Sequence, residues 1–172
     1  EQYLETLSER EVKSGYAEIF KHSLISASIF NLLLENHQLY YNEEIINNSI
    51  KIKNKIVSND KYEQNTRKNL NFGHTIGHAL ESYFLNKVNK LTHGEAISIG
   101  MICESFISNK IFNLNIKLVK KIKNHLLRIF PKVNLQHENY EEIIKLMSFD
   151  KKNHLDKLKF VLLKDLGLVK ID

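Results

Sequence analysis

The residues best suited to chemistry form a polar stripe in the middle of the chain. Arg67, Asn71, His74, His78 and Glu81 are separated by four, three, four and three residues, a spacing that stacks side chains along one face of a helix. An exposed helix face would usually carry lysines and glutamates, whereas this stripe carries two histidines. Imidazoles and carboxylates are zinc ligands in proteins. The stripe therefore indicates a metal-binding or ligand-binding site.

Two further groups of polar residues can complete such a site. His93 opens a predicted helix, and Glu18 lies one helical turn before Lys21. One glutamate and two histidines form a zinc-binding set that leaves positions open for oxygen atoms of a substrate. Spacing alone does not select the two histidines, because His74 and His78 at i, i+4 can also reach one ion. Spacing is equally compatible with a Glu18–Lys21 ion pair at the surface.

Three residues nearby depart from the regular helical pattern. Lys53 lies near the centre of the apolar arc of its predicted helix, so it either reaches solvent past the edge of the core or points into an enclosed site. Gly73 and Gly77 lie within another predicted helix, where each glycine costs about 1 kcal/mol relative to alanine. We expect another backbone or a ligand to approach closely there. The glutamate that zinc metalloproteases carry between their two histidines is missing, so a protease is a poor fit.

The apolar pattern predicts a mainly helical domain that positions these residues. Ser8 and Glu11 form a capping-box pattern that begins the first helix. Pro131 ends the sixth, because proline cannot continue a helix. We expect helices at about 8–20, 28–35, 42–57, 63–84, 93–110, 115–130 and 140–148, and a small β-hairpin of 159–163 and 168–171 that turns at Gly167.

The composition is that of a globular protein. The chain has 172 residues, of which 42% are hydrophobic and 26% charged, and its apolar runs are too short to cross a bilayer. A single cysteine excludes an internal disulfide framework and agrees with a reducing, cytoplasmic location. The net charge of +5 is spread along the chain. This indicates solvated faces rather than a nucleic-acid or membrane surface, and it suits a small anionic substrate.

Five segments, taken in order, resemble the 3-dehydroquinate synthases. The longest reads RKNLNFGHTIGHALE (67–81), and the others read SGYAEIFK (14–21), KNKIVSND (53–60), THGEAISIGM (92–101) and DKK (150–152). The resemblance implies that residues 1–172 are the multi-helix, metal- and substrate-binding C-terminal domain of that fold, with a minor β-hairpin. The family's N-terminal α/β domain, which carries most of the NAD-binding residues, is absent from these residues. Because the chain begins at a glutamate, we expect a fragment of a longer protein.

The resemblance also implies a role for individual residues. Glu18, His74 and His93 match the family's ligands for Zn²⁺, for which Co²⁺ can substitute, so that His78 lies in the site without binding the metal. Residues implied in catalysis are His78, Lys53 and Asn71. Residues implied in substrate binding are Lys21, Lys53, Arg67, Asn71, His78, Lys151 and Lys152, and of the last two Lys152 is favoured for direct contact.

The implied reaction is the NAD- and metal-dependent conversion of 3-deoxy-D-arabino-heptulosonate 7-phosphate to 3-dehydroquinate and phosphate. It belongs to the shikimate pathway of aromatic amino acid biosynthesis, and the family resemblance implies a homodimer.

Two alternatives remain within the fold: other sugar-phosphate cyclases, which make valiolone- or inosose-type rings, and related polyol dehydrogenases. The Arg67, Asn71 and Asp-Lys-Lys pattern favours the dehydroquinate enzyme. A non-catalytic helical module that docks a partner is an alternative of another class. Lys61 and Tyr62 depart from the family pattern without removing a metal or substrate residue.

Overall fold

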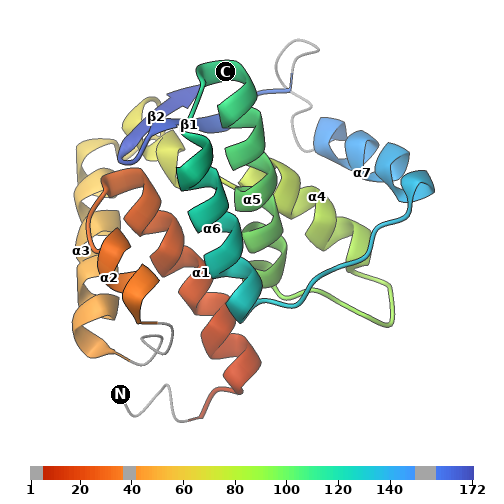
Figure 1. The fold of residues 1–172 in the computed structure, drawn as a ribbon, viewed down its shortest axis with the longest axis horizontal. Helices are drawn as coiled ribbons and strands as arrows, with labels where there is room; N and C mark the ends of the chain where they lie inside the picture. Colours follow the sequence, from red (N-terminus) through yellow and green to blue (C-terminus); the bar gives the residue numbers. More distant parts are fainter. Residues whose placement is uncertain (1–5, 37–41, 150–157) are drawn as a thin grey trace.

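A computed structural model describes residues 6–36, 42–149 and 158–172. These residues form a helical domain with a two-stranded sheet near the C-terminus (Figure 1), which confirms the predicted fold class. The elements in chain order are α1 (Glu9–Ser26), α2 (Phe30–Glu35), α3 (Glu43–Asn59), the 3₁₀-helix η2 (Thr66–Asn71), α4 (His74–Phe84), α5 (His93–Phe112), α6 (Ile116–Ile129), α7 (His137–Phe149), β1 (Val161–Asp165) and β2 (Leu168–Ile171).

Helix α1 begins where the sequence predicts and runs further. The Ser8 side chain accepts a hydrogen bond from the backbone N–H of Glu11, whose carboxylate accepts one from the N–H of Ser8. The predicted end near residue 20 is too early, because the helix continues to Ser26. The added turns bury Leu24 completely, so apolar burial extends the helix. The extra length gives α1 the reach to contact α3, α5 and η2.

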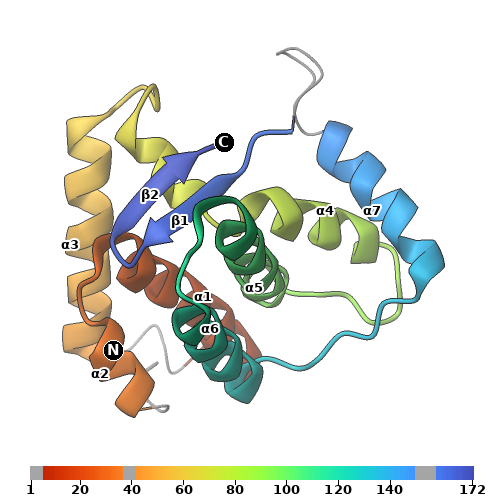
Figure 2. The same ribbon diagram turned by 45° about the horizontal axis from the view of Figure 1, so that its top comes forward.

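Helix α5 is the central element of the domain. It contacts α1, α4, α6 and β1, and Figure 2 shows it between α4 and α6. A capping box of Thr92 and Glu95 defines its first turn, and Ile97 and Met101 are fully buried. Since several elements enclose α5, the first turn that carries His93 is held firmly against α1 and α4.

The single helix predicted over 63–84 is wrong. That segment contains η2 and α4, which are separated at Gly73, where φ is 82°. Glycine adopts this left-handed conformation without strain, whereas other residues do not. A side chain at Gly73 would collide with Met101 on α5, and one at Gly77 would collide with Ile97. The predicted close approach at these two glycines is therefore confirmed, and the approaching element is α5.

The predicted C-terminal hairpin is confirmed. Strands β1 and β2 pair antiparallel, with Val161 opposite Ile171, and Gly167 takes a φ of 76° in the turn. The N–H of Gly167 donates a hydrogen bond to the carbonyl oxygen of Leu24 at 2.8 Å. Leu163 of β1 is fully buried. The hairpin therefore closes the core over the end of α1.

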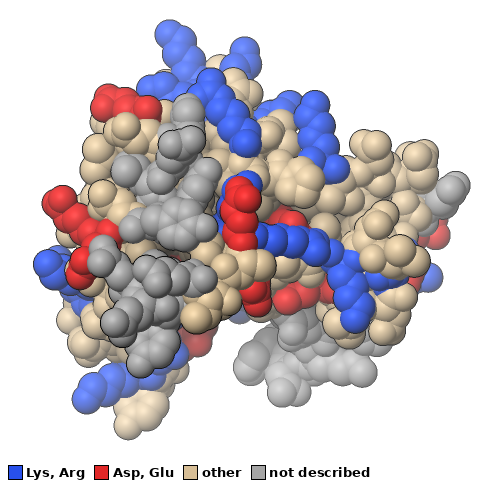
Figure 3. Space-filling model, turned by 90° about the horizontal axis from the view of Figure 1, so that it is seen from below, with Lys and Arg blue, Asp and Glu red and all other residues tan. Residues whose placement is uncertain are grey.

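The surface carries both signs of charge. Figure 3 shows one face, on which basic and acidic side chains are interspersed rather than separated into two regions. This distribution agrees with the interpretation of the charges as solvated faces. Among the described residues, no helix has both the length and the apolar character needed to cross a membrane.

Candidate metal and substrate site

Helix α1 supplies a carboxylate and a lysine to the candidate site. Lys21 Nζ donates a hydrogen bond to Glu18 Oε2 at 2.7 Å. The Lys21 side chain is only 2% exposed, so its amine lies inside the protein. Burial lowers the pKa of Lys21, and the charge of Glu18 opposes this shift. The pair is therefore not the solvated surface ion pair that spacing left open.

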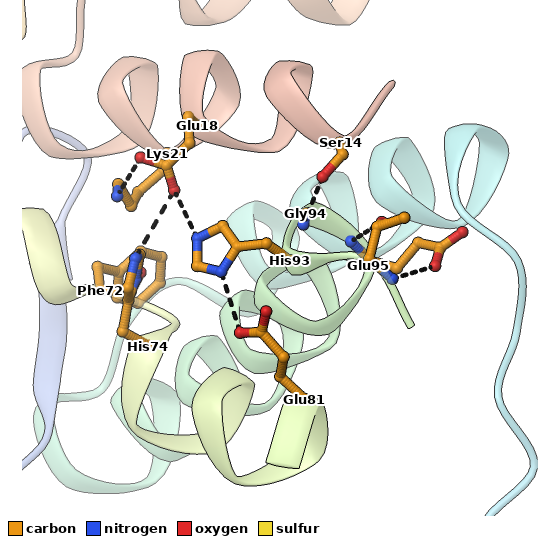
Figure 4. A network of polar contacts seen from close by, with 10 residues as sticks. Ser14, Glu18, Lys21, Phe72, His74, Glu81, His93, Gly94 and Glu95 are labelled. Carbon is orange, nitrogen blue, oxygen red and sulfur yellow. Dashed lines mark hydrogen bonds and ion pairs between the residues drawn. The ribbon is translucent and has the colours of Figure 1, made fainter. Parts of the chain in front are cut away.

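Two histidines approach Glu18 from the first turns of α4 and α5. The N–H of Gly94 donates a hydrogen bond to Ser14 Oγ at 2.8 Å, which holds the start of α5 against α1 (Figure 4). His74 Nε2 and His93 Nε2 each lie 3.7 Å from Glu18 Oε1. The three residues offer ligand atoms that all lie within 4.8 Å of one another. Three side chains that are distant in the sequence thus converge on one point.

The geometry of these three side chains fits a zinc or cobalt ion. Within the described part of the chain, Glu18 Oε1 is buried and has no hydrogen-bond partner, although buried polar atoms are nearly always paired. This is the oxygen that both Nε2 atoms approach. A tetrahedral zinc ion with bonds of about 2.1 Å separates its ligand atoms by about 3.4 Å, close to the 3.7 Å of the two contacts. A cation at this point would satisfy the unpaired oxygen.

The second nitrogen of each histidine ring already has a partner. His74 Nδ1 lies 3.2 Å from the carbonyl oxygen of Phe72, and His93 Nδ1 lies 3.1 Å from Glu81 Oε2. Both partners are acceptors, so each Nδ1 carries a hydrogen and donates it. In the neutral form of each ring, Nε2 then has a lone pair that faces Glu18, and this is the form that binds a metal. Glu81 therefore orients His93.

The electrostatics of the cluster agree with cation binding. Burial lowers the pKa of His74 to about 4, so its ring is neutral at neutral pH. The Glu18 carboxylate raises the pKa of His93 against the effect of burial, and Glu81 adds to the rise. Burial would raise the pKa of Glu18, but the two histidines and Lys21 outweigh it and hold this pKa well below its usual range. A charged carboxylate beside imidazole nitrogens attracts a divalent cation.

His78 lies beside the cluster, one turn after His74 on α4. The His78 ring centroid is 5.1 Å from that of His74 and 6.0 Å from that of His93. His78, Glu81 and His93 form a second group whose ligand atoms lie within 4.8 Å of one another. This second group lacks the unpaired oxygen of Glu18, and its Glu81 is already hydrogen-bonded to His93. The first group is therefore the better candidate for a metal site.

A cavity of about 190 Å³ lies next to the cluster. Its lining includes three cations, Lys21, Lys53 and Arg67, together with Asn71. Lysine and arginine side chains bind carboxylates and phosphates, and an amide can both donate to and accept from hydroxyl groups. Lys53 faces this cavity rather than the core, which accounts for a lysine within the apolar arc of α3.

A tight turn between α3 and η2 fixes the position of Arg67. The Asp60 carboxylate accepts hydrogen bonds from three backbone N–H groups within residues 64–67. These bonds lower the pKa of Asp60, and the bond from Arg67 has the largest effect. Asn71 Nδ2 donates a hydrogen bond to Glu63 Oε1 at 2.8 Å. The turn thus presents one cation and one amide to the cavity.

The structure brings together the described residues that the sequence analysis assigned to the site. Their arrangement differs from the predicted stripe in one respect, because η2 carries Arg67 and Asn71 whereas α4 carries two of the histidines. The two segments meet at an angle set by the break between them. Lys151 and Lys152 lie outside the described residues.

Sequence reasoning missed two polar residues of the cavity, His22 and Glu63. His22 is a buried histidine directly after Lys21. Its place on the inner face of α1 could have identified it as a candidate site residue. Glu63 lies in the turn before η2 with a φ of 54°. No periodicity marks a turn residue, so Glu63 gave no such signal.

The fold and the site define a helical domain with a candidate metal centre beside a cavity whose lining includes two lysines and an arginine. The family described as "3-dehydroquinate synthase C-terminal" matches residues 15–153, a range that includes the three candidate ligands. The chain belongs to this family.

Curated relatives carry the same family name. The 3-dehydroquinate synthase of Parabacteroides distasonis is 34% identical over 175 residues, which cover 99% of this chain and 50% of that protein. The 3-dehydroquinate synthase of Thermoanaerobacter pseudethanolicus is 36% identical over 178 residues, which cover 98% of this chain and 49% of that protein. The chain spans about half the length of the curated relatives it matches.

Solved structures share the fold. A 2-epi-5-epi-valiolone synthase from Streptomyces hygroscopicus subsp. jinggangensis, described with NAD⁺ and Zn²⁺ bound, superposes with a TM-score of 0.82 at 20% identity, over 99% of this chain and 49% of that one. A 2-deoxy-scyllo-inosose synthase, described in complex with carbaglucose-6-phosphate, NAD⁺ and Co²⁺, gives a TM-score of 0.72 at 28% identity, over 96% of this chain and 48% of that one. The predicted multi-helix fold is thus confirmed.

Proposed function

We propose that this chain is the metal- and substrate-binding part of a 3-dehydroquinate synthase of the shikimate pathway. The enzyme would convert 3-deoxy-D-arabino-heptulosonate 7-phosphate to 3-dehydroquinate and phosphate. One observation carries the proposal. His74 and His93 approach the buried, unpaired Oε1 of Glu18, next to a cavity whose lining includes lysine and arginine side chains. Since the chain spans half of its relatives, the NAD-binding part would lie outside these residues. A homodimer in the cytoplasm belongs to the same proposal.

Some residues of this chain would bind the metal, and others would bind the substrate. When bound, the metal supplies Lewis acidity toward a substrate hydroxyl, and NAD⁺ supplies a reversible hydride acceptor. Lys53 and Arg67 bind the anionic groups of a flexible substrate, and Asn71 holds a hydroxyl. Fixing several groups of one molecule supplies the orientation that ring closure requires. His78 is close enough to the cluster to move a proton to or from the bound substrate.

A second candidate is a cyclase that acts on a different sugar phosphate. The 28% identity to a 2-deoxy-scyllo-inosose synthase, described with carbaglucose-6-phosphate, favours this alternative over an unrelated activity. Two cations beside the amide of Asn71 favour a substrate that carries a carboxylate as well as a phosphate. A docking module for a protein partner would have no use for three ligand atoms that converge on one point.

The test is product analysis with the full-length protein loaded with zinc and NAD⁺. We expect 3-dehydroquinate and phosphate to appear in equal amounts from the heptulosonate phosphate. Glu18→Gln should abolish both products while the circular dichroism spectrum stays unchanged. Glucose 6-phosphate is the competing substrate. Phosphate release from glucose 6-phosphate, with none from the heptulosonate phosphate, would overturn the assignment in favour of the second candidate.

A further inference from the structure

His22 has a ring nitrogen that nothing in the described protein satisfies. It lies on α1 directly after Lys21, is 3% exposed, and lines the same cavity as the three cations. His22 Nδ1 is hydrogen-bonded to Ser49 Oγ on α3 at 2.7 Å. In the described residues, His22 Nε2 is buried and has no hydrogen-bond partner. A buried polar atom without a partner destabilises the folded state, so something else must pair with it.

The position of the ring is set firmly, which is what a binding residue requires. Ser49 is 5% exposed and holds one edge of the ring from the side of α3. Lys53 lies one turn after Ser49 on the same helix and also lines the cavity. The unpaired nitrogen is on the other edge of the ring from Ser49. Helices α1 and α3 therefore present His22, Lys21 and Lys53 to one cavity.

The state of the ring allows Nε2 to act as a hydrogen-bond donor. Burial and the charge of Lys21 together lower the pKa of His22 to about 4. The ring is therefore neutral at neutral pH and carries one hydrogen. When the Ser49 hydroxyl donates to Nδ1, that hydrogen is on Nε2. A donor beside lysines and an arginine matches an anionic oxygen rather than another cation.

We propose that His22 is a further substrate-binding residue, whose Nε2–H donates a hydrogen bond to a carboxylate or phosphate oxygen of the bound sugar acid. The proposal rests on the proposed function for the identity of that ligand. It adds a neutral, directional donor to the charges of Lys21, Lys53 and Arg67. Charges attract an anion from any direction, whereas a buried N–H accepts only one orientation of the oxygen. His22 would therefore fix the orientation of the anionic group.

A pair of substitutions separates the two ring nitrogens. In His22→Gln the side-chain amide nitrogen reaches the place of Nε2, and in His22→Asn it reaches only the place of Nδ1. Both variants of the full-length protein are assayed with zinc, NAD⁺ and the heptulosonate phosphate. We expect His22→Asn to raise KM roughly tenfold or more and His22→Gln to recover most of this loss. Zinc affinity should be the same in all three proteins. Equal KM values in both variants and the wild type would overturn the proposal.

A measurement on the wild type needs a variant only to assign its resonances. The full-length protein is labelled with ¹⁵N-histidine, and the His22 resonances are assigned by their loss in His22→Gln. Inorganic phosphate and acetate are then added separately. We expect the Nε2 resonance to move with at least one of them, and the anion that moves it identifies the group that His22 binds. A resonance unchanged by both anions, as for a ring paired with a buried water, would overturn the proposal.

Failure of the proposed function and failure of the proposed role of His22 would give different results. If the wild type makes no 3-dehydroquinate but its His22 Nε2 resonance responds to an anion, the proposed substrate is wrong and the anion site is correct. If the wild type makes 3-dehydroquinate and the two variants match it in KM, the proposed function is correct and the role of His22 is wrong.

Discussion

The side chains of the candidate metal centre depend on groups that do not touch the metal position. His93 Nδ1 is held by Glu81, and His74 Nδ1 is held by the carbonyl oxygen of Phe72. These contacts decide which nitrogen of each ring is available. The spacing of histidines in the sequence carried no information of this kind, because His74 and His78 satisfy the i, i+4 rule equally well with either ring nitrogen.

Substitution of single histidines distinguishes the two possible ligand sets. We expect His93→Ala to lose bound zinc, since it removes one of the three proposed ligands, whereas His78→Ala keeps it. Zinc content after gel filtration, measured by atomic emission, gives the comparison. Both variants remove an imidazole of the same cluster, so each controls for the other. Equal loss of zinc from the two variants would contradict the assignment of Glu18, His74 and His93.

Removing the charge of Glu81 should weaken zinc binding without removing a ligand. A carboxylate that orients a metal-binding histidine contributes about 10- to 100-fold to metal affinity. We expect Glu81→Gln to lower zinc affinity by an amount in this range, measured by competition with a chromophoric chelator. Glu142→Gln, which changes an exposed carboxylate on α7, is the matched control. An unchanged affinity in Glu81→Gln would show that the charge of Glu81 does not contribute to zinc binding.

At the scale of elements, the site is built on the break between η2 and α4. Glu104, a fully buried residue of α5, accepts hydrogen bonds from the N–H groups of Gly73 at 2.6 Å and Ile76 at 3.3 Å. A carboxylate at a helix N-terminus satisfies N–H groups that have no partner within the helix. Glu104 thus fixes where α4 begins and where His74 points.

This break also marks the limit of what the sequence could predict. Helical periodicity and caps located α3, α5 and α6 and the hairpin, because those signals are local. The break at Gly73 depends on contacts with Met101 and Glu104 about 30 residues further along the chain, which no local pattern contains. The convergence of Glu18, His74 and His93 was implied by the family resemblance. Their spacing left the choice of ligands open.

The turn that presents Arg67 can be tested through Asp60. We expect Asp60→Asn to raise KM for the heptulosonate phosphate, because one amide group cannot accept all three backbone hydrogen bonds. Misplacing a substrate-binding group by about 1 Å costs up to about 100-fold in rate, so we expect a loss between about 10- and 100-fold in kcat/KM. Zinc affinity should stay unchanged, because no ligand lies in this turn. A loss of zinc would instead indicate that the turn supports the whole site.

At the scale of the whole molecule, the candidate metal centre and the cavity form one half of the proposed active site. The cavity combines residues of α1, α3 and η2 with His74, and the ligands come from α1, α4 and α5. The described residues therefore supply the groups that the proposed binding of a metal and an anionic substrate requires. The hydride acceptor that the proposed reaction requires is assigned to the half of the relatives that this chain does not match.

The 172-residue chain on its own should bind zinc and fail to turn over. Its three candidate ligands and their orienting partners all lie within the described residues, so zinc should raise its melting temperature. Turnover should be absent even with added NAD⁺, because the nicotinamide would have no binding surface, and the full-length protein is the positive control. Zinc-dependent stabilisation shows that the isolated chain is folded when the assay is made. Formation of 3-dehydroquinate by the isolated chain would refute the division of the reaction between two halves, and a folded chain without zinc-dependent stabilisation would refute the metal centre itself.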